Sequence, residues 1–386
     1  MQRRKFVSKL LCGGSLAWPL GALVARAWEG ESPGNAPHDG AAGKRSLAER
    51  HERACAALRR AVDAKQVAAA TIFTRRGDEQ RSSAFGAAAN EHAMFLLGSI
   101  SKPIAIAALM TLHDRRAFEL DDLASRYLPA FRGAGREQVT IRQLLTHVSG
   151  LPDQLPENAA LRARKATLAE FAEAAQRTPL SFAPGSQYQY SSMGILLAAK
   201  IAEQLAGDDI RSLVERAVFR PLGMTRSAQG LGAFRLDEFV SVQTERAAPE
   251  SGGGDPRSRE WDWNSSYWRS LGAPWGGTHS SAPDLGKLLA EFLRPTGAIL
   301  KPETARLMVA NHNPAGRTPR GLGWNVGAAA GVRGCGDRTF GHTGSTGTLA
   351  WADPATDAIC VVLTSLPGRA VQPHPRETSA HEFNTG

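Results

Sequence analysis

Ser99 and Lys102 are the two residues of this 386-residue sequence whose types and spacing best suit catalysis. An apolar run over 94–97 precedes them, and an alanine-rich apolar segment over 104–110 follows, which predicts a helix that begins close to Ser99. Residues i and i+3 share one face of a helix, so the hydroxyl and the amine can meet. A serine beside an amine at the positive end of a buried helix is a candidate nucleophile with its own base.

The elements that must position this pair are strands at both ends of the chain and helices between them. Apolar residues at helical spacing predict helices over 46–62, 141–147, 167–176, 193–205, 209–218 and 282–293. Strands are expected over 67–74, 80–87, 348–351 and 358–364. This order predicts an α+β fold, in which the N- and C-terminal segments form one antiparallel sheet flanked by helices and a mostly helical lobe is inserted.

The domain boundaries follow from the same pattern. We expect a single domain over 46–386, with an α/β lobe made of 46–114 and 281–366 and a helical lobe made of 115–280. Residues 28–45 are rich in Gly, Pro and Ala and are expected to be a flexible lead. The tail 367–386 does not resemble a closing helix and is left unassigned.

Residues 1–27 have the composition of an export signal. Arg3, Arg4 and Lys5 form a basic start, an apolar stretch over 10–24 follows, and Ala25-Arg26-Ala27 gives a small-x-small ending. The paired arginines predict the twin-arginine type of signal. We therefore expect bacterial export to the periplasm or the medium, with no stable membrane span once the signal is cleaved.

Charge and cysteine content exclude several kinds of function. The net charge is +9, but more than half of it comes from the basic residues of 1–27, so we expect no nucleic-acid partner. After cleavage Cys55, Cys335 and Cys360 remain, an odd number at wide spacing, which permits at most one disulfide. No His or Cys pair has metal-ligand spacing, so we expect neither a metal site nor a cofactor. We expect a monomer.

Three short motifs occur in order along the chain: Ser99-x-x-Lys102, Tyr190-Ser191-Ser192 and His342-Thr343-Gly344. Together they resemble the serine β-lactamase and penicillin-recognising superfamily, whose motifs have the general form S-x-x-K, S-D-N and K-T-G. The tyrosine and the histidine are more similar to the branch of class C β-lactamases, D-alanyl-D-alanine carboxypeptidases and related serine esterases. The resemblance covers about 46–366 and includes further matching segments at 145–152, 221–224 and 321–324.

The resemblance implies a role for each matching residue. Ser99 would attack an acyl carbon and form an acyl-enzyme, with Lys102 or Tyr190 as the base, an alternative that the sequence leaves open. Ser192, His342, Thr343, Gly344 and Ser345 would contact the substrate. The main-chain N–H groups of Ser99 and Ser345 would form the oxyanion hole.

Two of these positions depart from the family pattern. Ser192 stands where asparagine is usual, and its hydroxyl has a single donor, which argues against efficient β-lactam hydrolysis. His342 replaces a lysine and is expected to be mostly neutral, which favours uncharged esters or peptides over tight capture of an anion. His147 is expected to hold its loop, and Tyr188 to be a core residue. An aromatic group could line an acyl pocket or form a separate small core: Trp261, Trp263, Tyr267, Trp268 and Trp275.

The sequence therefore predicts an exported serine hydrolase that acts on a small-molecule ester or on a D-amino-acid peptide. Two alternatives remain open at this point. One is a class C-like β-lactamase, and the other is a penicillin-binding sensor or scaffold that does not turn over.

Overall fold

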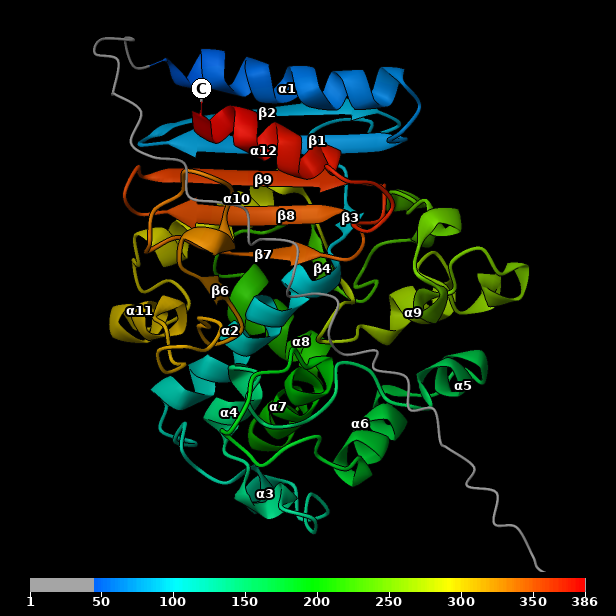
Figure 1. The fold of residues 1–386 in the computed structure, drawn as a ribbon, viewed down its shortest axis with the longest axis vertical. Helices are drawn as coiled ribbons and strands as arrows, with labels where there is room; N and C mark the ends of the chain where they lie inside the picture. The colour runs from blue at the N-terminus through cyan, green and yellow to red at the C-terminus, as the bar shows by residue number, and fades with distance from the viewer. Residues whose placement is uncertain (1–44, 386) are drawn as a thin grey trace, which may run out of the picture. The chain divides into compact units, whose positions relative to one another are not determined.

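The computed structural model describes residues 45–385, so the expected export signal and residues 28–44 of the expected lead lie outside the described residues. A six-stranded antiparallel sheet in the order β2-β1-β9-β8-β7-β6 dominates one end of the molecule (Figure 1). Its strands are β1 Ala69–Arg76, β2 Glu79–Gly86, β6 Asn325–Val326, β7 Phe340–Gly344, β8 Thr348–Asp353 and β9 Ala358–Thr364.

Within residues 45–385 the first and last strands, β1 and β9, pair directly and lie in the one sheet predicted for both ends of the chain. In the register of β1 and β9, Ile72 is opposite Val362 and Phe73 is opposite Val361. All of β9 is buried, because helices cover both faces of the sheet at this position. The α+β class and the closure of the sheet by both ends of the chain are confirmed.

Helices α1 (Leu47–Asp63) and α12 (Pro375–Thr385) cover one face of the sheet, and α10 (Ala282–Leu293) packs on the other (Figure 1). The helix α12 lies in the tail 367–386, which the sequence left unassigned because the tail does not resemble a closing helix. The ion pair between Arg53 and Glu382 joins α12 to α1. The segment that ends at Thr385 thus belongs to the helical layer that covers this face of the sheet.

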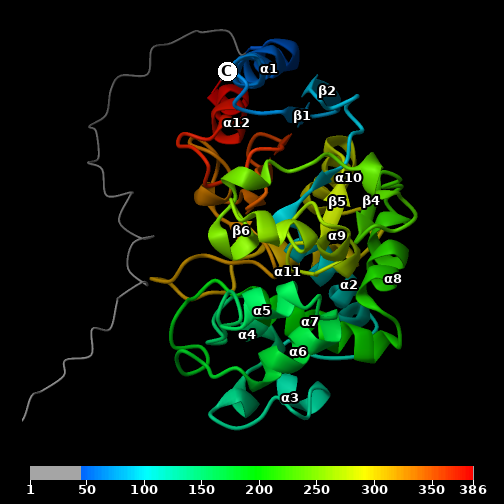
Figure 2. The ribbon, with the colours of Figure 1, turned by 90° about the vertical axis from the view of Figure 1, so that its right-hand side faces the viewer.

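The helical region lies beyond the β7–β6 edge of the sheet (Figures 1 and 2). At its centre, α2 (Ser101–Asp114) is buried from Ser101 to Leu112 and packs against α7 (Ser192–Ala206) and α8 (Ile210–Val214). A helix that is apolar all round belongs in a core. The other helices of this region are shorter than α2 and α7: α3 Ala124–Tyr127, α4 Ile141–Leu145, α5 Asn158–Ala163, α6 Leu168–Arg177 and α11 Pro302–Val309.

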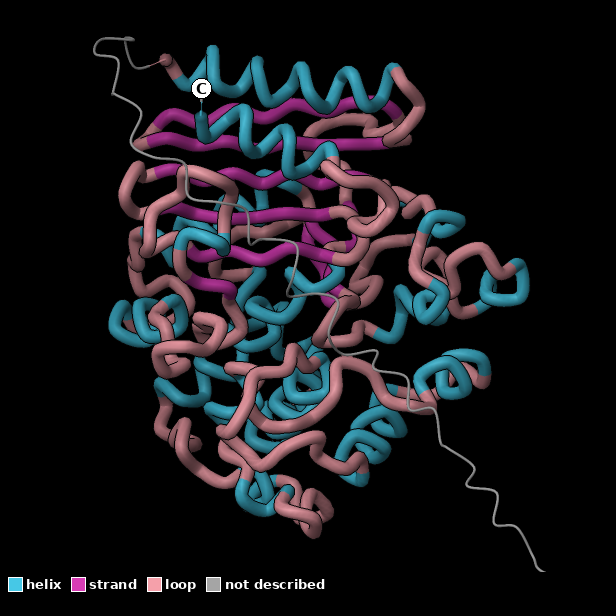
Figure 3. Tube along the Cα trace, in the orientation of Figure 1, coloured by secondary structure: helices cyan, strands magenta, loops and turns pink. Residues whose placement is uncertain are grey.

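A second, three-stranded sheet in the order β3-β5-β4 fixes the segment that leads into Ser99 (Figure 3). Its strands are β3 Phe95–Leu96, β4 Ser227–Gln229 and β5 Thr278–Ser280. The region 249–279, for which the sequence predicts neither a helix nor a strand, contains the helix α9 (Ser266–Leu271) and part of β5. Within residues 45–385 no helix combines the length and the apolarity that crossing a membrane requires.

Candidate active site

Ser99 lies in a single 3-10 turn, Gly98–Ile100, directly before α2, so its predicted position at the start of a helix is confirmed. Two threonines of the β7–β8 hairpin hold this turn. The Oγ1 atoms of Thr346 and Thr348 donate to the main-chain carbonyls of residues 96 and 97, each at 2.6 Å. These bonds fix the serine against the edge of the large sheet.

Lys102 lies directly beneath the serine. Its Nζ atom is 3.0 Å from Ser99 Oγ and donates to the main-chain carbonyl of Trp275 at 3.0 Å. The side chain is completely buried, and burial lowers the pKa of Lys102 to about 7; the Asp153 carboxylate acts against this decrease and Arg320 adds to it. An amine with this pKa is available as a base near neutral pH.

Tyr190 stands over the lysine, immediately before the N-cap of α7. The centre of its ring lies 4.7 Å from Lys102 Nζ and 4.6 Å from the ring of His147. Burial by these neighbours raises the pKa of the Tyr190 phenol well above its usual value, while the positive charge of Arg320 opposes the rise. The structure thus brings Ser99, Lys102 and Tyr190 together.

His147 has the structural role expected of it. Its Nδ1 atom accepts the main-chain N–H of Ser191 at 3.1 Å, which ties the loop after α4 to the start of α7. Burial holds the pKa of His147 well below its ordinary value, so the ring is neutral.

Ser192 is buried, and its hydroxyl donates to Asp153 Oδ1 at 2.5 Å. The sequence analysis missed Asp153, although it directly follows the 145–152 segment singled out there. The carboxylate also accepts the main-chain N–H of Ser192 at 3.1 Å and lines the pocket above Ser99. A negative charge therefore lies near the amine where an amide was to be expected from the family pattern.

The strand β7 carries the third motif along the other wall of the site. His342 Nδ1 donates to the carbonyl of Thr343 at 2.7 Å, which leaves Nε2 as an acceptor in the neutral ring. Burial, Arg320 and Lys102 all hold the pKa of His342 well below its ordinary value. A Cβ built on Gly344 would lie 2.0 Å from the Leu97 carbonyl oxygen, so only glycine allows β7 to approach the Ser99 turn this closely.

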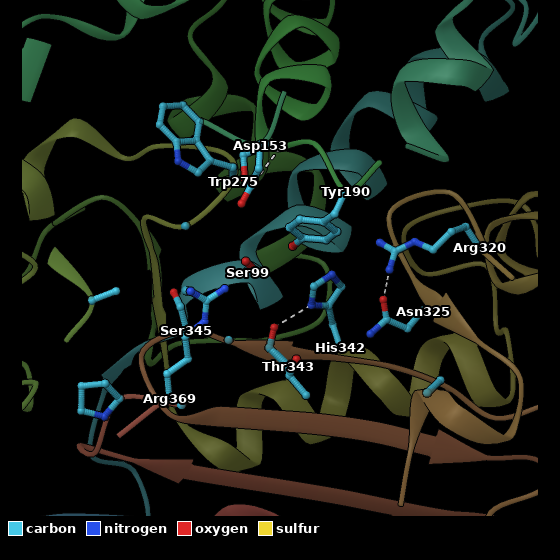
Figure 4. A pocket seen from close by; sticks show the side chains of 18 of the residues that line it. Ser99, Asp153, Tyr190, Trp275, Arg320, Asn325, His342, Thr343, Ser345 and Arg369 are labelled. Carbon is cyan, nitrogen blue, oxygen red and sulfur yellow. Dashed lines mark hydrogen bonds between the residues drawn. The ribbon is translucent and has the colours of Figure 1, made fainter. Parts of the chain in front are cut away.

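A pocket of about 670 Å³ opens above Ser99 (Figure 4). Every predicted site residue except the buried Lys102 lines it: Ser99, Tyr190, Ser192, His342, Thr343, Gly344 and Ser345. Three of the five aromatic residues also line it, namely Trp263, Trp268 and Trp275. Tyr188 lines the pocket as well and is only partly buried, so its assignment to the core was wrong.

Arg320 is the second residue that the sequence analysis missed. It directly precedes the matching segment 321–324, is 3% exposed and lines the pocket on the side of Tyr190 and His342 (Figure 4). Its guanidinium carbon lies 5.6 Å from the centre of the Tyr190 ring. The pocket therefore has a cation of its own, in contrast to the neutral site expected from His342 alone.

This arrangement has the parts needed for covalent acyl transfer. A hydroxyl, an amine of lowered pKa and a phenol converge at the base of a pocket in which the strand β7 approaches the nucleophile closely. Within residues 45–385 no group of three or more His, Cys, Asp or Glu side chains is arranged to hold a metal ion. Cys55, Cys335 and Cys360 are free, buried thiols.

Comparison with known proteins identifies the family. Residues 48–384 match the protein family Beta-lactamase. A relative from Escherichia coli O157:H7, named "Putative D-alanyl-D-alanine carboxypeptidase", is 26% identical over 291 residues, which are 67% of this chain and 66% of the relative. Esterase EstB of Burkholderia gladioli is 34% identical over 200 residues, which are 48% of each chain.

The fold also matches a solved structure. A penicillin-binding protein homologue from Caulobacter crescentus superposes with a TM-score of 0.73 at 18% identity, covering 87% of this chain and 97% of that one. The chain belongs to the beta-lactamase family, as its three motifs indicated. The two curated relatives are named as a carboxypeptidase and an esterase, which are both hydrolases.

Proposed function

We propose that this protein is an exported enzyme that cleaves ester or D-amino-acid amide bonds through an acyl-enzyme on Ser99. The observation that carries the proposal is the distance of 3.0 Å between Ser99 Oγ and Nζ of the fully buried Lys102. A neutral amine in this position accepts the serine proton as the oxygen attacks the acyl carbon. Because the pKa of Lys102 is about 7, this base is present in quantity near neutral pH.

Tyr190 completes the proton path in this proposal. Its phenol, whose pKa burial raises, is protonated in the free enzyme and stands over Lys102, so it can pass a proton to the leaving group as the tetrahedral intermediate collapses. Water then attacks the acyl carbon, and the same pair removes and returns a proton to release Ser99. The main-chain N–H groups of Ser99 and Ser345 are proposed to stabilise the oxyanion, since β7 lies against the serine turn.

The proposed substrate class is inferred from the residues that line the pocket. Trp263, Trp268 and Trp275 offer an apolar, aromatic surface that suits an acyl group. The only donor of the Ser192 hydroxyl is directed to Asp153, so this side chain is not available to donate to a substrate amide. Together with the esterase and carboxypeptidase relatives, this favours esters and D-amino-acid peptides over β-lactams.

The test is turnover by the wild-type enzyme and Ser99→Ala, followed with p-nitrophenyl butyrate, a D-alanyl-D-alanine peptide, a penicillin and a cephalosporin. We expect steady release of nitrophenol or D-alanine by the wild type only. Rapid cephalosporin opening would establish the β-lactamase alternative, and a penicilloyl adduct that persists without turnover would establish the sensor. Equal turnover by Ser99→Ala would contradict all three.

A further inference from the structure

Arg320 is a buried cation without a charged partner. Its side chain is 3% exposed, and among residues 45–385 no carboxylate forms an ion pair with it. Nη1 donates to the side-chain oxygen of Asn325, while Nε and Nη2 are buried and have no hydrogen-bond partner within the described part of the chain. Removing an arginine from water without pairing it is costly, so its retention here needs a reason.

The main chain on either side holds this residue rigidly. The N–H of Arg320 donates to the side-chain oxygen of Asn311 at 3.0 Å, and its carbonyl accepts the N–H of His312 at 2.8 Å. The side chain is thus aimed at one place, the corner of the pocket where Tyr190 and His342 meet (Figure 4).

The charges around Tyr190 show what Arg320 can act on. The groups that face or influence the phenol come from several elements: Lys102 on α2, His147 after α4, Asp153 in the following loop, His342 on β7 and Arg320 before β6. The two histidines are neutral because burial lowers the pKa of each. Asp153 is negative and lies beside Ser192. Arg320 is therefore the one permanent cation among these described groups.

We propose that Arg320 is a positioning residue of the reaction, whose fixed charge keeps the Lys102–Tyr190 pair ready to take the Ser99 proton. A lysine at the first position of the third motif would carry a positive charge, whereas this chain has the neutral His342 there. Arg320, in the segment before β6, supplies a positive charge instead. This inference rests on the proposed function, because it concerns the proton acceptor for Ser99.

The sign of the effect does not depend on which member of the pair is the base. The guanidinium lowers the pKa of both Lys102 and Tyr190, since a positive neighbour disfavours the protonated ammonium and favours the phenolate. Loss of the charge raises both pKa values, so the acidic limb of the kcat profile moves to higher pH. A charge within about 4–6 Å typically shifts a pKa by about 1 unit or more.

The experiment measures kcat between pH 5 and 10 with a neutral p-nitrophenyl ester, so that binding of a charged substrate plays no part. We expect Arg320→Met to move the acidic limb up by about 1 pH unit. In Arg320→Lys the limb should stay close to its wild-type position. In the double variant Arg320→Met/His342→Lys the limb should move back toward the wild-type position. An acidic limb that Arg320→Met leaves in place, or a rate loss that is equal at every pH, would overturn the proposal.

Asn325→Asp provides the second variant, because it keeps Arg320 and converts its hydrogen-bond partner into a carboxylate of the same shape. The new ion pair neutralises the cation and supports folding, so the acidic limb should again move up; an unchanged limb would contradict the proposal.

Ser99→Ala separates the proposed function from the proposed role of Arg320. If it retains turnover the proposed function fails, whereas an unshifted limb in an enzyme that depends on Ser99 overturns only the role of Arg320.

Discussion

Asp153 and Ser192 form a closely bonded pair, in which one carboxylate oxygen accepts both the main-chain N–H and the hydroxyl of the serine, at 3.1 and 2.5 Å. The Asp153 carboxylate of this pair raises the pKa of the Lys102 amine, and the positive charge of Arg320 lowers it. The proton affinity of the amine is the balance of these two charges and of burial. Each charge can be removed separately, with effects of opposite sign.

Replacing Asp153 with Asn is expected to move the acidic limb of the kcat profile to lower pH. The carboxylate raises the pKa of Lys102, so its loss favours the neutral amine at more acidic pH. The amide oxygen of Asn can still accept from Ser192, which preserves the start of α7. The measurement is kcat against pH with a neutral ester, and a limb that moves up would contradict the electrostatic argument.

Replacing Lys102 with Met is expected to abolish turnover and to stabilise the fold. The pKa of Lys102 falls from its model-compound value of 10.5 to about 7, so the folded chain releases a proton that the unfolded chain keeps between these two pH values. The cost of burying the ammonium is fully present below pH 7 and declines as the pH rises above it. Urea unfolding should therefore show the largest gain for Lys102→Met near pH 6 and a smaller one near pH 9; a loss of stability at pH 6 would be inconsistent with this account.

The hydroxyl of Tyr190 is expected to contribute directly to turnover. Tyr190→Phe keeps the ring over Lys102 but removes the proton donor, and should lower kcat by about 10²–10⁴-fold if the phenol is the acid–base group. Tyr127→Phe is the matched control. The Tyr127 phenol, on α3, donates to the Asp122 carboxylate at 2.6 Å and does not line the pocket. Equal kcat values for the two variants would remove Tyr190 from the proton path.

Glycine at position 344 is expected to be essential for the close approach of β7 to the nucleophile. In Gly344→Ala the new Cβ would lie 2.0 Å from the Leu97 carbonyl oxygen and 2.2 Å from Thr348 Oγ1, so the strand must move away from the serine turn. We expect a lower Tm and a large loss of kcat. Gly77→Ala is the control: it meets no atom within 4 Å and should cost only about 1 kcal/mol of strain, without loss of kcat. Retention of full activity by Gly344→Ala would contradict the proposed geometry.

The central part of the site could be predicted because its residues carry local signals. Ser99 and Lys102 lie three residues apart where an apolar helix begins, and the second and third motifs have recognisable neighbours. Asp153 and Arg320 could not be assigned in this way, because they come from irregular segments that only the tertiary structure brings to the pocket. Both directly adjoin segments that had been singled out, which is a signal that could have directed attention to them.

The helix α12 was missed for a different reason. Few of its residues are apolar, and the buried ones include Arg376 and Ser379 beside Ala380 and Phe383. Periodicity in hydrophobicity is therefore weak, and packing against α1 and the sheet determines the structure of this segment. Tertiary contacts of this kind leave little trace in a local window of sequence.

The most direct test of the catalytic role of Ser99 is intact-protein mass spectrometry after exposure to a fluorophosphonate, followed by peptide mapping. A nucleophilic serine displaces fluoride and retains the phosphonyl group. We predict one adduct per wild-type chain, located on Ser99, and none on Ser99→Ala under the same conditions. An adduct on another residue, or equal labelling of Ser99→Ala, would contradict the account.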